Sequence, residues 1–158
     1  MIKIKELTPP DDIFRSKGLK KKIIFLFTNM DELNSLTIRL LQVRNQMKIY
    51  HWQTKSYARH KATDSFLQKF EPLVDRLVEA IQGGLGIGIQ FNSGTCVGVK
   101  DCSEDGAKDD AKDLLTNFRI VLINNNNYQS LFDHPEFAQI RDDMLEVVDV
   151  TLYLFTLK

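Results

Sequence analysis

Hydrophobic residues recur at steps of three and four along the first half of the chain, and this periodicity constrains the fold more than any other feature of the sequence. Such spacing places apolar side chains on one face of an α-helix, which must then be buried. In residues 28–53 this face is formed by Leu33, Leu36, Leu40, Val43, Met47 and Tyr50. The pattern predicts a first helix that begins near Thr28 as its N-cap and ends near Gln53.

A second helix is predicted over residues 57–82, with Gly83 and Gly84 marking its end. Its apolar face consists of Phe66, Leu67, Phe70, Leu73, Val74, Leu77, Val78 and Ile81. Pro72 lies within the segment and lacks the N–H group that a helical hydrogen bond needs. Because the apolar period continues across Pro72, we expect a kinked but continuous helix.

The second half of the chain predicts two more helices, which a long link joins to the first pair. Residues 83–107 contain most of the eight glycines together with alternating Ile, Phe and Val, a composition that favours an irregular or partly extended connection. The third helix is expected over residues 107–123, and the last from Pro135, a favoured first helical position, to the C-terminus. This order predicts an all-α, ferritin-like four-helix bundle with one long crossover between the second and third helices.

The composition predicts one soluble domain, residues 28–158, preceded by a basic N-terminal extension, residues 1–27. The 158 residues are 43% hydrophobic and 27% charged, and Lys plus Arg equal Asp plus Glu at 21 each, so no net charge attracts nucleic acid or a membrane. The longest apolar run, residues 23–27, is too short to span a bilayer, and we see no export signal. We expect a cytoplasmic protein with no membrane partner, in which Cys96 and Cys102 stay reduced.

Four polar residues of the second predicted helix share one side of it. His60, Asp64, Asp75 and Glu79 are spaced by four, eleven and four positions, which at about 100° per residue places them within one sector. Imidazole and carboxylate side chains one helical turn apart are suitable metal chelators. The spacing therefore predicts two pairs of metal ligands on this helix.

The two ligand pairs are too far apart to bind one metal ion within one chain. At about 1.5 Å per residue their outer Cα atoms are roughly 17–28 Å apart. Two chains whose second helices pack antiparallel across a two-fold axis would bring the start of one helix against the end of the other. The sequence therefore predicts at least a homodimer with two shared sites, in which His60 and Asp64 meet Asp75 and Glu79 of the other chain and His51 adds a nitrogen donor.

The pattern His51-Trp52, His60-x-x-x-Asp64 and Asp75-x-x-x-Glu79 resembles the ferroxidase motif of the Dps mini-ferritins, the DNA-binding proteins from starved cells. The resemblance covers residues 36–82 well and the second half of the chain by architecture alone. It implies that iron, or another divalent first-row metal, binds between subunits and that Fe(II) is oxidised with peroxide or dioxygen. The ligands would be His51, His60 and Asp64 from one chain and Asp75 and Glu79 from the other.

The same resemblance implies further roles for Trp52 and for the basic N-terminal segment. Trp52 would lie beside the iron as an oxidisable neighbour, whereas the residues alone leave a core position equally open. Many Dps proteins form a twelve-subunit shell, and basic tails bind DNA in some of them. Here such a tail would act through Lys17, Lys20, Lys21 and Lys22, whose few charges predict modest, salt-sensitive affinity.

A second hypothesis is a ferritin-like structural or interaction protein without iron chemistry, associated with a virion or with nucleic acid. Its motivation is the short spacing between His51 and His60, the Gly-rich crossover and the basic tail. Residues 51–64 also look similar to uncharacterised ferritin-like proteins of large DNA viruses. In that case the protein would lie in a host cytoplasm or virion, and the same polar residues would form a hydrogen-bond network across the dimer. The remaining polar residues are expected at the surface or as a helix cap: His134, Asp142, Asp143, Glu146 and Asp149.

Overall fold

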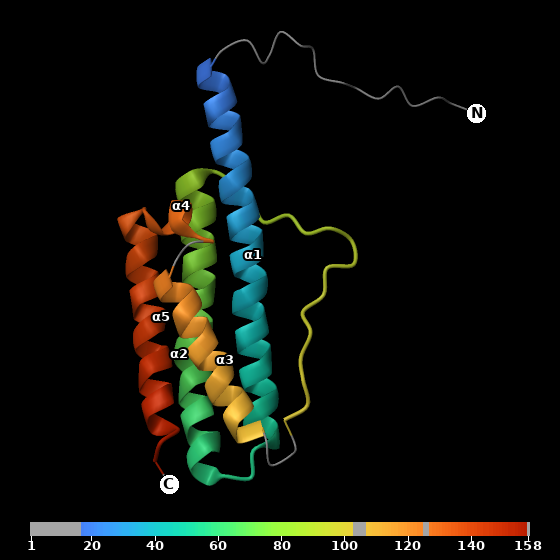
Figure 1. Ribbon diagram of the computed structural model, residues 1–158, viewed down its shortest axis with the longest axis vertical. Helices are drawn as coiled ribbons and strands as arrows, with labels where there is room; N and C mark the ends of the chain where they lie inside the picture. Colours follow the sequence, from blue (N-terminus) through green and yellow to red (C-terminus); the bar gives the residue numbers. More distant parts are fainter. Residues whose placement is uncertain (1–16, 103–106, 125–126, 158) are drawn as a thin grey trace, which may run out of the picture.

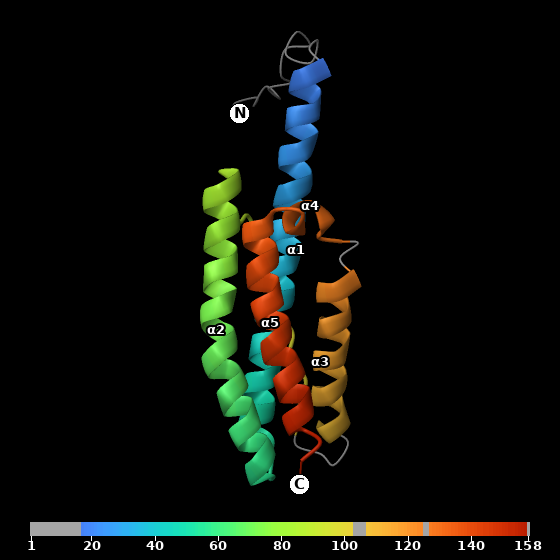
Figure 2. The same cartoon turned by 90° about the vertical axis from the view of Figure 1, so that its left-hand side faces the viewer.

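The computed structural model describes residues 17–102, 107–124 and 127–157, and these residues contain helices and irregular segments but no β-strand. The helices are α1 (Lys17–Gln53), α2 (Tyr57–Leu85), α3 (Ala107–Asn124), α4 (Gln129–Phe132) and α5 (Pro135–Leu154). Four long helices lie side by side, and the one-turn helix α4 leads into α5 (Figures 1 and 2). The predicted all-α class is confirmed.

The core lies where the apolar faces of the long helices meet. α2 packs against α1 and α5, and α3 packs against the same two helices. All six apolar residues that define the first predicted face are at most 1% exposed. Phe70 is central to the packing, because its ring stacks on Phe66 at 4.8 Å and meets the edge of Phe118 on α3 at 5.7 Å. No helix in the described part of the chain has the length and hydropathy to cross a membrane.

The first helix begins at Lys17 rather than near Thr28, so the predicted start and N-cap were wrong. The extra turns project beyond the ends of the other helices (Figure 1). Residues 19–27 contain no glycine or proline, and a helix that is already formed propagates through such residues at low cost because nucleation is the unfavourable step. Lys17, Lys20, Lys21 and Lys22 are therefore part of α1, while residues 1–16 lie outside the described residues.

The second helix is continuous through Pro72 and ends at Leu85, three residues beyond the predicted end. Its C-cap is Gly86, whose φ of 64° is the left-handed conformation that glycine adopts without strain. Gly84 instead lies inside the helix, where an added Cβ would come within 2.9 Å of the Phe137 ring on α5. At its other end the helix is capped by Ser56, whose hydroxyl oxygen accepts a hydrogen bond from the Arg59 amide at 3.4 Å.

The Gly-rich crossover is irregular in its described residues, 86–102, as predicted, and it runs along α1 (Figure 1). The side-chain amide of Gln46 pairs with the backbone of Lys100, accepting from the amide at 2.7 Å and donating to the carbonyl at 2.9 Å. Gln53 likewise accepts from the Cys102 amide at 2.6 Å. In these bonds side chains of α1 pair with backbone groups of the crossover, so they hold the crossover against α1 although its described residues form no β-strand. Cys96 and Cys102 are both free thiols, the first exposed and the second buried.

We expect Gln46→Ala to release the crossover locally and to expose Cys102. The Cys102 thiol is 5% exposed and burial raises its pKa, so it reacts slowly with thiol reagents in the intact protein. Gln46→Ala removes both bonds to Lys100 and a third, from the Gln46 amide to the Cys102 sulfur at 2.9 Å. The third bond lowers the pKa of the Cys102 thiol, so its loss opposes the gain from exposure. At about 1 kcal/mol for each backbone bond, exposure still predicts about a tenfold increase in the rate of modification. Mass spectrometry of the labelled peptides measures this rate, with Gln42→Ala one turn earlier as the matched control. An unchanged Cys102 rate would show that Gln46 does not hold the crossover.

Candidate metal centre

His51 and His60 come together at the joint between α1 and α2. His51 lies in the last turn of α1 and His60 in the first turn of α2. Their rings stack with centroids 4.0 Å apart and planes 25° apart. His51 is only 8% exposed, and His60 is half-buried. The three-residue turn 54–56 is short enough to place the two rings side by side, which helical periodicity alone could not predict.

Each histidine bonds through Nδ1 to the backbone carbonyl of the other. His60 Nδ1 lies 3.0 Å from the His51 carbonyl oxygen, and His51 Nδ1 lies 3.2 Å from the His60 carbonyl oxygen. A carbonyl oxygen only accepts hydrogen bonds, so each Nδ1 carries the hydrogen and each neutral ring keeps its lone pair on Nε2. Neither Nε2 atom has a hydrogen-bond partner among the residues that the structure describes. Metal-binding histidines are commonly oriented in this way, with one nitrogen bonded to a carbonyl and the other free for the ion.

The buried position of His51 favours its neutral form. Burial lowers the pKa of His51 below its ordinary value, and the adjacent His60 lowers it further. The hydrogen bond to the His60 carbonyl raises the pKa of His51, and the Asp64 carboxylate raises it more weakly, but burial and the charge of His60 outweigh both. A metal ion binds the neutral imidazole, so these surroundings keep His51 available as a ligand near neutral pH.

The stability of the metal-free protein should depend on pH through His51. Its folded-state pKa lies below 6.5, so the unfolded chain binds more protons below that pH and the free energy of unfolding falls as the pH decreases. His51→Asn keeps a side-chain N–H but cannot gain a charge, and we expect it to make this pH dependence shallower. Urea unfolding at several pH values, in the presence of a chelator, measures the effect. His134→Asn is the control, and an equal change in both variants would contradict the assignment.

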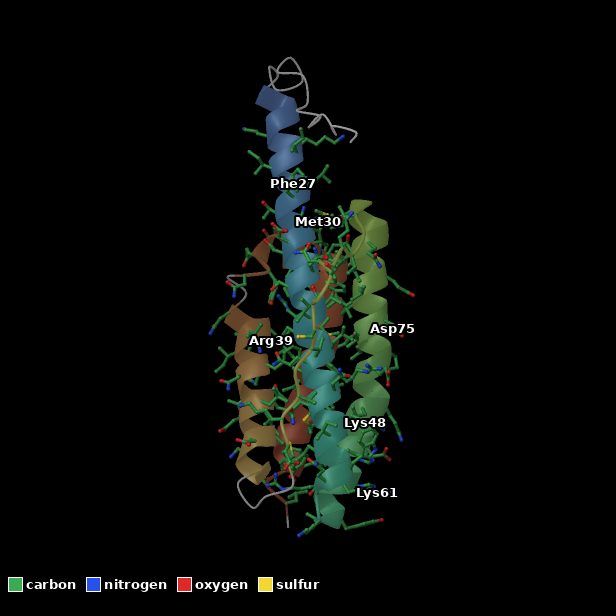
Figure 3. All side chains as sticks on the ribbon, turned by 90° about the vertical axis from the view of Figure 1, so that its right-hand side faces the viewer. Phe27, Met30, Arg39, Lys48, Lys61 and Asp75 are labelled. Atoms are coloured by element: carbon green, nitrogen blue, oxygen red, sulfur yellow. The ribbon has the colours of Figure 1, made fainter. Side chains whose placement is uncertain are left out.

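The three predicted carboxylate ligands lie on α2 but do not gather with the histidines. Asp64 is half-buried one turn after His60 and accepts a hydrogen bond from Gln68 at 3.3 Å. Asp75 and Glu79 are exposed and lie farther along the helix, with Asp75 labelled in Figure 3. Within the described residues, no three His, Cys, Asp or Glu side chains come close enough to hold a metal ion. One chain thus presents a histidine pair at one end of α2 and a carboxylate pair toward the other.

Trp52 is not a core residue, since it is 65% exposed. Its ring faces solvent beside α1, and the Lys48 ammonium group lies 5.5 Å from the ring centroid. The position at the end of α1 leaves the indole next to the histidine joint in sequence but outside the packed interior.

The other polar groups considered from the sequence lie at the surface. Asp143 pairs with Arg76 at 3.0 Å and Asp149 with Arg119 at 2.5 Å, so these carboxylates are neutralised by neighbouring helices. Asp142 and Glu146 are exposed on the same helix, and His134 is the N-cap residue of α5. Lys21 and Lys22 are exposed, while the side chains of Lys17 and Lys20 lie outside the described ones. Nucleic-acid binding by these lysines stays a prediction.

Two residues that sequence reasoning missed support the histidine joint. Thr63 is fully buried, and its hydroxyl oxygen lies 3.2 Å from His51 Nδ1 while its own hydrogen is directed to a backbone carbonyl of α2. Arg59 donates to the Tyr50 hydroxyl at 3.3 Å and to the Phe155 carbonyl at 3.2 Å, and so ties the joint to the end of the chain. The sequence contains only a weak signal of this support, a threonine shortly after His60, and such a neighbour is common in helices that bind no metal.

Among the comparisons with known proteins, only a family profile matches the chain. No curated protein and no solved structure matches it. A family profile matches residues 51–155, a stretch that begins at His51 and includes His60, Asp64, Asp75 and Glu79. The chain therefore belongs to DUF5856, a family of unknown function.

Proposed function

We propose that this protein is a ferritin-like protein of the Dps type, which takes Fe(II) as its substrate at a site shared by two chains and oxidises it for iron sequestration or protection against peroxide. The observation that carries the proposal is the pair of reciprocal Nδ1 bonds between His51 and His60. These bonds hold two neutral rings whose Nε2 atoms bond to no other residue that the structure describes. The four long helices with a single crossover are compatible with a ferritin-like bundle.

A second chain supplies the missing carboxylates in this proposal. If two α2 helices pack antiparallel, so that His60 lies at the height of the partner's Glu79, Asp64 lies at the height of the partner's Asp75. Each dimer then has two equivalent sites with two imidazoles and three carboxylates, a mixed ligand set that suits iron. The exposure of Asp75 and Glu79 supports this arrangement, because both are accessible to a partner.

The proposed reaction transfers electrons from iron to an oxidant. Two Fe(II) ions give up one electron each, and a peroxide molecule takes both electrons and two protons as its O–O bond breaks to give two water molecules. The neutral histidines and the carboxylates would stabilise the Fe(III) product more than the Fe(II) substrate, because carboxylates add negative charge at the site. The exposed indole of Trp52 is available as an oxidisable neighbour.

Anaerobic titration with Fe(II) tests the proposal directly. We expect about two saturable Fe(II) sites per dimer in the wild-type protein. Addition of peroxide should then oxidise the bound iron, and the absorbance of the Fe(III) product measures this oxidation. Asp142→Ala, an exposed carboxylate on α5, is the matched control and should bind normally. Absence of saturable Fe(II) binding in the wild-type protein would overturn the proposal.

One observation favours the second candidate, a structural protein without iron chemistry. The reciprocal histidine bonds also join α1 to α2 without any metal, and Thr63 completes them. In that case His60→Ala would lower the stability of the metal-free protein while leaving its content of first-row metals unchanged. Elemental analysis of protein purified without added metal distinguishes the two candidates, since the iron site predicts stoichiometric metal that His60→Ala removes.

A further inference from the structure

The outward side of α1 carries a second row of residues, separate from its buried face. The row recurs at steps of three and four from Ile23 to Trp52, and every member is at least partly exposed. The crossover passes beside its first part, where Asn34 accepts a hydrogen bond from the Gln90 amide at 2.9 Å and Phe27 and Met30 line a hollow with Gly86 and Ile87. It consists of Ile23, Phe27, Met30, Asn34, Ile38, Leu41, Asn45, Lys48 and Trp52. Figure 3 shows Phe27, Met30 and Lys48 along α1, and Lys61 and Asp75 along the neighbouring α2. We use the name α1/α2 face for the surface formed by this row of α1 and the adjacent residues of α2, among them Lys61 and Asp75.

The two ends of the α1/α2 face are its most exposed apolar parts. At one end Phe27 is 60% exposed, on the part of α1 that projects beyond the end of α2 (Figure 3). At the other end Trp52 is 65% exposed and Tyr57 is 76% exposed, on either side of the turn between α1 and α2. Apolar side chains gathered in this way mark interaction surfaces. A single chain cannot bring the two ends together, because they lie at opposite ends of the helices.

The charges between these ends favour a second copy of the chain as the partner. Lys48 and Lys61 lie on the half of the face near Trp52, together with the carboxylate Asp64, whereas Asp75 and Glu79 lie on the half near Phe27. A copy that packs antiparallel sets these two lysines against the acidic half of its partner and leaves Asp64 opposite the acids that share the proposed metal, while a parallel copy would set lysine against lysine and acid against acid. The face is therefore complementary to itself only in the antiparallel orientation.

The heights of the residues along the helices fix which apolar groups would meet. The stacked rings of His51 and His60 and the 2.8 Å ion pair of Arg44 with Glu71 set the register of α1 against α2. With His60 at the height of the partner's Glu79, Met30 then lies at about the height of the partner's Tyr57. Phe27 lies within about one helical turn, or 5.4 Å, of the same height.

We propose that the projecting part of α1, with the turn that follows it, clasps the turn between α1 and α2 of a second copy of this chain, with Phe27 and Met30 packing on the partner's Tyr57 and the partner's Trp52. This clasp rests on the antiparallel pairing of the proposed function. Three aromatic side chains at these exposures bury on the order of 500 Å² in each contact. The contact occurs twice in a two-fold dimer, so it supplies a large share of the roughly 1,600 Å² of a typical stable interface.

Cross-linking between two marked chains tests the clasp. One full-length chain carries Phe27→Cys and the other Tyr57→Cys, both with Cys96→Ser so that the exposed native thiol is absent. A short bismaleimide reagent should join the mixed pair efficiently. A pair in which Tyr153→Cys on α5 replaces Tyr57→Cys is the matched control and should join poorly, although Tyr153 is 63% exposed.

The outcomes separate the clasp from the iron chemistry. Cross-linking of the mixed pair supports the clasp, including in a protein that fails to bind Fe(II), in which case only the proposed function is lost. Chains that share Fe(II) sites but do not join through positions 27 and 57 overturn the clasp alone. Preferential joining of Phe27→Cys chains to each other also overturns it, because the projecting helices would then pair with one another.

A second measurement uses the strength of the dimer. We expect Phe27→Ser to raise the dissociation constant measured by sedimentation equilibrium about 30-fold or more, because the side chain is lost from both contacts of the dimer. Circular dichroism verifies that the variant is folded, which its exposed position favours. Tyr153→Ser removes an equally exposed aromatic from α5 and should leave the constant unchanged. An unchanged constant for Phe27→Ser would contradict the clasp.

Discussion

Mixed dimers of one His60→Ala chain and one Asp75→Ala chain are expected to recover about half of the wild-type Fe(II) capacity, although dimers of either variant alone bind poorly. Each proposed site takes its histidines from one chain and its far carboxylates from the other. In the mixed dimer one site lacks both side chains, and the second site contains neither substitution. Removing a residue that hydrogen-bonds to a metal ligand typically weakens metal affinity by about 10–100-fold. Removing the ligand itself should weaken Fe(II) affinity by at least as much.

The experiment needs the two variants co-expressed with different tags, so that the mixed dimer can be isolated before anaerobic titration. A mixed dimer of His60→Ala with Asp64→Ala is the matched control. Both substitutions affect the same half of a site, so each of its two sites retains one defect and no capacity should return. Recovery in this control, or none in the first mixture, would show that the ligands are not divided between chains as proposed.

The largest expected loss of stability follows from Phe70→Ala. Phe70 is fully buried and contacts aromatic rings on both sides, Phe66 within α2 and Phe118 on α3. Its truncation removes buried apolar surface and leaves a cavity between helices, which costs about 3–5 kcal/mol. At about 2–4 °C per kcal/mol for a chain of this size, the thermal midpoint should fall by about 10 °C.

Differential scanning calorimetry of the metal-free protein measures this loss. Lys69→Ala is the matched control, because it is an exposed neighbour on the same helix and should change the midpoint by about 1 °C or less. A small effect of Phe70→Ala would indicate that the interior collapses around the missing ring. Because Phe70 lies close to the middle of α2, a large effect would also weaken the surface on which the second chain is proposed to pack.

The long helices and their buried faces could be predicted because helical periodicity is a local property. Each of the six apolar residues that define the first face is buried at its predicted position. The common side of His60, Asp64, Asp75 and Glu79 on α2 follows from the same periodicity, since all four lie on one continuous helix. The start of the last helix at Pro135 was also predictable, because a proline in the first turn of a helix costs no backbone hydrogen bond.

Helix ends were harder to predict because they depend on contacts and backbone conformations that the pattern does not contain. Residues 20–27, in the projecting turns of α1, are a basic run followed by an apolar run. They show no helical periodicity, so the sequence did not indicate that the helix begins before Thr28. Gly83 and Gly84 suggested a helix end, yet Gly84 allows α2 to approach Phe137 and the left-handed cap is Gly86. The one-turn helix α4 was missed for a similar reason, since four residues give no period.

The sequence by itself determined four long helices, their buried faces and two candidate ligand pairs too far apart for one ion, because these follow from the rise and period of a helix. Only the tertiary structure decided that His51 and His60 stack, that their Nδ1 atoms bond to each other's carbonyl oxygens, and that Trp52 is exposed. Such features depend on how α1 and α2 meet across a three-residue turn. Ring orientation there is set by packing and hydrogen bonds between residues of different helices, and no periodic pattern records those interactions.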